Sequence, residues 1–86
     1  MSIGEVRAAL QAAQTLIVDQ YGVAGDVLGF VSEDIEPMIG AALRGSGRPE
    51  AEEIARASST IVVAARDLHQ ALGYTMGLIE RFLAEL

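Results

Sequence analysis

His69, the single histidine in this 86-residue sequence, is the side chain best suited to metal binding or proton transfer near neutral pH. Metal sites in helical bundles pair a histidine with a glutamate three residues earlier. That position is occupied by Arg66, and the chain has no cysteine. We therefore expect no metal site and no cofactor, and we place His69 on a helix flank, at an interface or in solvent.

The hydroxyl and carboxylate clusters also lack the partners that catalysis needs. Residues 58–60 (SST) have no accompanying His-Asp pattern for a hydrolase triad. The acidic residues within 33–36 (EDIE) could form an acid–base pair, but a solvated surface beside Pro37 is the preferred interpretation. The glutamates within 50–53 suit the start of a helix. We expect no catalytic residue and no enzymatic activity.

Composition limits the class of partner. The net charge is −6, and the six cations, all Arg, are scattered along the chain. Binding to nucleic acid needs clustered cations, so it is not expected, and neither is binding to an anionic membrane surface. No run of 18 uncharged residues predicts a membrane span, and the N-terminal residues do not resemble a signal peptide.

The chain is too short to hide its apolar residues by itself. A chain of 86 residues forms at most one domain, yet 51% of its residues are hydrophobic. Small domains bury only about 60% of their unfolded surface. A second chain is the simplest cover for the apolar surplus.

A polar break at residues 44–50 (RGSGRPE) divides two helical patterns of similar length. Gly45 occupies the expected place of a left-handed residue after a helix. Pro49 suits the first position of the next helix, and the glutamates that follow favour its positive end. These signals predict a turn at 45–48.

The first arm is predicted to be one helix over about 3–44. Ser2 and Glu5 fit a capping box at its start, and apolar residues then recur every three or four positions as far as Ile39 and Ala42. Pro37 removes a helical hydrogen bond, so we expect a kink near 33–37. The competing interpretation is a true break, with Ser32 or Asp34 capping a short second helix.

Four glycines in this arm, Gly22, Gly25, Gly29 and Gly40, leave two interpretations open. They lie on one strip, where they could allow another backbone to approach closely. They could equally do no more than loosen the helix.

The second arm is predicted to be a helix over about 49–85, which must pack antiparallel to the first. The expected fold class is all-α: a two-helix hairpin, residues 1–86, that forms a four-helix bundle as a dimer. The predicted hairpin seam or partner interface consists of Ile3, Leu10, Ile17, Tyr21, Leu28, Val31, Ile35, Ile61, Leu68, Leu72, Ile79 and Leu83. Apolar residues outside that seam predict a partner surface, made of Leu16, Val23, Val27, Phe30, Val63, Tyr74 and Leu78.

This layout resembles the small WXG-type helical hairpins of type VII secretion in actinobacteria, in their short variants with a Gly-Ser-Gly corner followed by Pro-Glu. Residues 44–50 carry the resemblance, together with the Ala- and Arg-rich second helix that ends in residues 79–83 (IERFL). The chain has no Trp and so lacks the Trp-x-Gly turn. It also lacks the export signal of that family, a Tyr followed four residues later by an acid, since Gly25 and Leu78 follow Tyr21 and Tyr74 at that spacing.

The resemblance implies a non-enzymatic protein that pairs with itself or with a paralogous hairpin, as a secreted substrate or as the partner of a larger effector. It further implies a cytoplasmic location before secretion that needs no signal peptide. The alternative is a cytoplasmic four-helix dimer that acts as a regulatory or adaptor protein.

Overall fold

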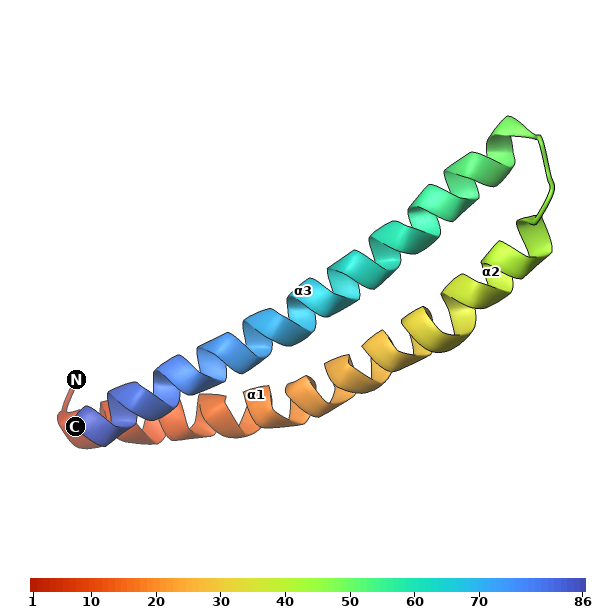
Figure 1. The fold of residues 1–86 in the computed structure, drawn as a ribbon. Coiled ribbons are helices and arrows are strands. Elements are labelled where there is room, and N and C mark those ends of the chain that lie inside the picture. Colours follow the sequence, from red (N-terminus) through yellow and green to blue (C-terminus); the bar gives the residue numbers. More distant parts are fainter.

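The computed structural model, which describes residues 1–86, is an all-α helical hairpin without strands. The first arm consists of α1 (Ile3–Phe30), a short π-helix η1 (Val31–Ile35) and α2 (Glu36–Leu43). The second arm is the single helix α3 (Pro49–Glu85). The two arms meet at the corner after α2 (Figure 1).

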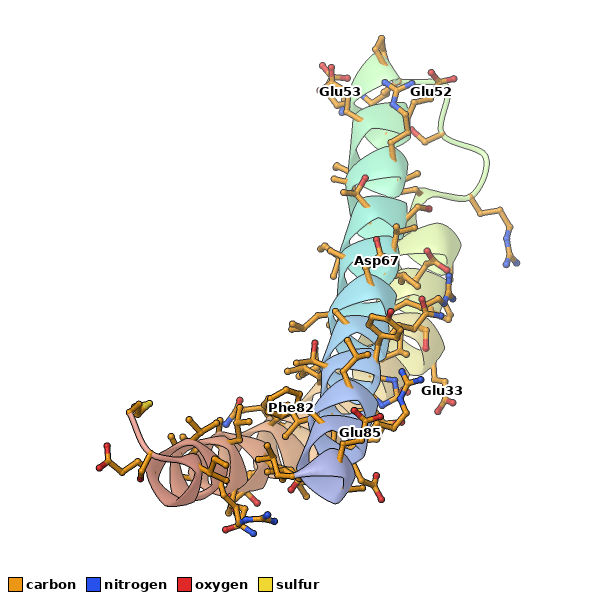
Figure 2. The ribbon with its side chains drawn as sticks, turned by 90° about the vertical axis from the view of Figure 1, so that its left-hand side faces the viewer. Glu33, Glu52, Glu53, Asp67, Phe82 and Glu85 are labelled. Atoms are coloured by element: carbon orange, nitrogen blue, oxygen red, sulfur yellow. The ribbon has the colours of Figure 1, made fainter.

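The molecule is long and thin. Its principal extents are 62 × 18 × 15 Å, and its radius of gyration is 18.9 Å, against about 12 Å for a compact domain of this length. The arms cross one another: in Figure 2 the first turns of α1 lie to the left of α3, and α2 lies to its right. No helix combines the length and the apolar character needed to cross a membrane.

The corner follows the sequence prediction closely. Gly45 has a φ of 78°, the left-handed conformation that favours glycine. The Ser46 N–H donates to the Leu43 carbonyl oxygen at 3.0 Å and closes the end of α2. Helix α3 begins at Pro49. At the other end of the hairpin, Ser2 Oγ accepts from the Glu5 N–H at 3.1 Å, which is one half of the predicted capping box.

The first arm bends at η1, within a helix that does not break. Pro37 has no N–H to donate to Glu33, and its ring crowds that carbonyl group. The turn widens, and the Glu36 N–H donates to Val31, five residues back. Ser32 donates its hydroxyl back to the Leu28 carbonyl oxygen at 2.7 Å, so it bends the helix and does not cap a new one. The structure therefore has the kink, and the break is wrong.

The wider turn also changes which residues of α2 face α3. After η1, Ile39 and Leu43 are half-buried, whereas Ala42 is exposed. The apolar pattern therefore does not continue in phase to Ala42, because the extra residue in the π-turn rotates everything that follows it.

The seam between the arms is narrow, and on α3 it is made largely of small residues. Five residues of the chain are buried: Ala24, Val31, Ala51, Ser58 and Val62. All hydrogen bonds join residues that are close in sequence, and none connects α1 with α3. Apolar contact alone therefore holds the arms together.

Candidate functional site

No catalytic or metal-binding arrangement forms in this hairpin. No group of three or more His, Cys, Asp or Glu side chains is placed to hold a metal ion. The residues with distinctive geometry are instead apolar or aromatic, and they lie in two places: the seam between the arms and one side of the hairpin.

The middle of the seam contains a stacked pair of rings. Tyr21 of α1 and His69 of α3 lie with their ring centroids 4.2 Å apart and their planes 18° from parallel. His69 is therefore half-buried inside the hairpin, not on an outer flank as the sequence was interpreted. Its neighbour is an aromatic ring, not a ring of acids.

Two glycines make room for this pair, in a reciprocal arrangement. A Cβ atom at Gly25, four residues after Tyr21, would lie 3.1 Å from His69 Nε2. A Cβ atom at Gly73, four residues after His69, would lie 3.0 Å from Tyr21 Cε2. Each ring thus covers a glycine of the opposite helix. Gly25 allows a close approach, as one interpretation of the strip proposed, whereas Gly22, Gly29 and Gly40 have no such neighbour.

Around this pair, the residues that face the other arm recur at intervals of seven, as in a coiled coil. This inner seam consists of Leu10, Gln14, Ile17, Tyr21, Ala24, Leu28, Val31 and Ile35 on the first arm, and of Ala51, Ser58, Val62, Ala65, His69, Leu72, Met76, Ile79 and Leu83 on α3. All of them are buried or half-buried.

A second apolar surface repeats at the same interval and remains open to solvent. We call it the outer face. On α1 it consists of Ala9, Ala13, Leu16, Gln20, Val23, Val27 and Phe30, and on α3 of Ile54, Ala57, Ile61, Ala64, Leu68, Ala71, Thr75, Leu78 and Phe82. Ala13 is half-buried, and the rest are exposed. No residue of the outer face is charged.

The two halves of the outer face lie on the same side of the hairpin. Val23 and Val27 of α1 line one shallow groove together with Leu68 of α3, and its volume is about 260 Å³. Further along, Leu78 and Phe82 line a second groove with Leu10. Figure 2 shows Phe82 on the side of α3 toward the first turns of α1, with Glu33 on the other side. The grooves are almost wholly apolar, which suits side chains of another protein better than a polar substrate.

The predicted interface residues divide between the two surfaces. The inner seam contains Leu10, Ile17, Tyr21, Leu28, Val31, Ile35, Leu72, Ile79 and Leu83, whereas Ile61 and Leu68 belong to the outer face and Ile3 is exposed at the end of α1. Of the predicted partner surface, Leu16, Val23, Val27, Phe30 and Leu78 lie on the outer face. At about 100° per residue, Val63 projects from the opposite side of α3, and Tyr74 lies beside the outer face.

The sequence prediction missed this rotation of α3. It assigned the large residues Ile61 and Leu68 to the face that meets α1, whereas the small residues Ala51 and Ser58 occupy that position. The signal was present as two apolar rows, each repeating every seven residues, about 100° apart on one helix.

The exposed surface is larger than one chain of this mass needs. The hairpin exposes 6144 Å², whereas a compact monomer of 9.1 kDa would expose about 4,900 Å². The excess, roughly 1,200 Å², exceeds the area of about 800 Å² that each partner buries in a stable complex of standard size.

In comparisons with known proteins, no family model, no curated protein and no solved structure matches the chain. The function therefore has to be argued from the hairpin itself.

Proposed function

We propose that this protein is a non-enzymatic interaction module that pairs through its outer face with another helical hairpin and so completes a four-helix bundle. The observation that carries the proposal is a charge-free apolar face that spans both helices and remains uncovered. Surface hydrophobic residues that are scattered singly need no explanation, but a continuous patch of this size marks an interface.

The amount of buried surface points the same way. With five buried residues in 86, the isolated hairpin lacks the core that stabilises a domain of ordinary size. Pairing would bury Leu16, Val23 and Phe30 of α1, together with Ile61 and Leu68 of α3. Each large side chain that is fully buried contributes about 1.5–3 kcal/mol.

The resemblance of the chain to WXG-type hairpins supports placing this pairing in a type VII secretion context, as a secreted substrate or as an escort for a larger effector. Culture filtrates of strains with and without that secretion system test this part of the proposal. Equal export in both strains would remove the secretion context and would leave pairing unaffected.

Light scattering combined with circular dichroism tests pairing directly. Purified protein at micromolar concentration is expected to have twice the chain mass of 9.1 kDa and to be strongly helical. Leu68→Glu places a charge at the centre of the outer face and should dissociate the complex. Val63→Glu is the matched control, because Val63 is 51% exposed and Leu68 56% exposed, and it should leave the mass unchanged.

Two results would bear against pairing. A monomer that melts cooperatively and well above room temperature needs no partner and would refute the proposed function. Equal behaviour of the two glutamate variants would show that the outer face is not the surface involved.

A further inference from the structure

We propose that the partner hairpin is a second copy of this chain, related to the first by a two-fold axis parallel to the helices, so that α1 of each copy packs against α3 of the other and both corners lie at the same end. This inference rests on the proposed function and names its partner and arrangement. It is argued from three properties of the outer face: height, side-chain size and charge.

The heights of the residues follow from the hairpin itself. Val23 and Leu68 line the same groove and so lie at the same level along the molecule. A two-fold axis parallel to the helices preserves height. It therefore brings Val23 of one copy opposite Leu68 of the other without any adjustment of register.

The sizes of the side chains complement one another at that register. Steps of seven residues from Val23 and Leu68 set Leu16 opposite Thr75 and Ala9 opposite Phe82. The second row of each helix sets Ala13 opposite Leu78, Gln20 opposite Ala71 and Val27 opposite Ala64. A large side chain mostly meets a small one, which is the condition for dense packing. Phe30 opposite Ile61 is the exception, where two large side chains meet.

An axis perpendicular to the helices is the main competing arrangement, and it pairs α1 with α1 and α3 with α3. It fits less well, because at the best register Leu16 then meets Val27, and Ile61 meets Leu78, as large pairs. The two helices in contact would again be antiparallel in that arrangement, so helix dipoles do not distinguish the two. Packing therefore favours the parallel axis.

Charge beside the outer face favours the same arrangement. A row of exposed acids borders the face on α1, namely Glu5, Asp19, Asp26 and Glu33. On α3 the corresponding row is mixed and includes Asp67, Tyr74 and Arg81. Pairing α1 with α1 would set the acidic row against its own copy, whereas pairing α1 with α3 sets it against the mixed row. Like charges side by side destabilise an interface, although salt screens such exposed pairs.

Disulfide cross-linking tests the arrangement, because the chain has no cysteine of its own. Val23→Cys and Leu68→Cys are made in separate chains and mixed in a glutathione redox buffer, and intact-mass spectrometry then identifies the covalent dimers. The parallel axis predicts a disulfide between position 23 of one chain and position 68 of the other, in excess over both symmetric disulfides. The two copies of each position lie on a diagonal of the bundle, too far apart for a disulfide.

The matched control replaces Val23→Cys with Val63→Cys in the same mixture. The two valines have the same chemistry and nearly the same exposure, 53% and 51%, but Val63 lies off the outer face. Its mixture with Leu68→Cys should give no excess of the mixed disulfide.

The outcomes separate this inference from the proposed function. A wild-type dimer in which symmetric 23–23 or 68–68 disulfides dominate overturns the parallel axis and leaves pairing intact. A wild-type chain that is monomeric and poorly helical alone overturns the second copy as partner and leaves a paralogous hairpin in that role. A stably folded monomer overturns both.

Discussion

Replacing Gly73 by alanine tests the packing of the seam, because the substitution changes two energies of opposite sign. In a helix interior, alanine is more favourable than glycine by about 1 kcal/mol. The new Cβ atom would lie 3.0 Å from Tyr21 Cε2, however, and the Tyr21 ring is held on its other side by His69 at 4.2 Å. Overpacking of this kind costs about 1–3 kcal/mol.

Gly77→Ala provides the control for this experiment. It is in the same helix, and its Cβ atom would have no neighbour within 4 Å, so only the helical gain applies. The gain cancels between the two variants, and Gly73→Ala should be less stable than Gly77→Ala by about 1–3 kcal/mol. Each kcal/mol corresponds to about 4–8 °C in Tm for a domain of this size.

The assay is thermal unfolding followed by circular dichroism, with all proteins at one concentration because the Tm of an oligomer depends on it. Gly77→Ala should melt above wild type, and Gly73→Ala below Gly77→Ala. Equal increases in Tm for the two variants would refute the tight contact between Tyr21 and Gly73. Gly25→Ala against Gly22→Ala repeats the comparison from α1, where His69 Nε2 would lie 3.1 Å from the new atom.

Two further substitutions test local features by the same melts. Ser58 is 4% exposed and its hydroxyl has no hydrogen-bond partner, so Ser58→Ala should raise stability by up to about 1–3 kcal/mol, and a lower Tm would contradict this; exposed Ser59→Ala should change stability by less than about 0.5 kcal/mol. Gly45 has a φ of 78°, so Gly45→Ala should cost about 1–2 kcal/mol. Gly47, which lacks a positive φ, should tolerate alanine, and equal losses at both positions would remove the assigned role of Gly45.

The features that the sequence predicted best are those set by local chemistry. Gly45 and Pro49 act on the backbone within a few residues, so the corner and the start of α3 could be predicted without knowledge of the rest of the chain. Pro37 likewise predicts a kink. The width of the turn at η1 could not be predicted, because it depends on how the arm still packs against α3 beyond the proline.

The facing of α3 is where prediction from one chain fails, for a physical reason. Burial favours large apolar residues, and that rule assigned Ile61 and Leu68 to the seam with α1. Two helices approach closely only where side chains are small, and Ala51 and Ser58 permit that approach. When a helix has two apolar rows, its sequence does not state which row faces its own chain and which faces a partner.

His69 illustrates the same limit at a single residue. Its spacing to other residues correctly gave no reason to expect a metal site, but no local signal linked it to Tyr21, 48 positions away (69 − 21). The link becomes visible only once Gly25 and Gly73 are seen to lie opposite the two rings.

The absence of any hydrogen bond between the arms implies an order of assembly. Each helix closes its own backbone bonds, so each can form before the arms meet, and contacts local in sequence favour fast folding. Closing the hairpin then buries few side chains, and the outer face waits for another molecule. The last step depends on concentration and the earlier ones do not, so dilution should undo the assembly first and the helices last.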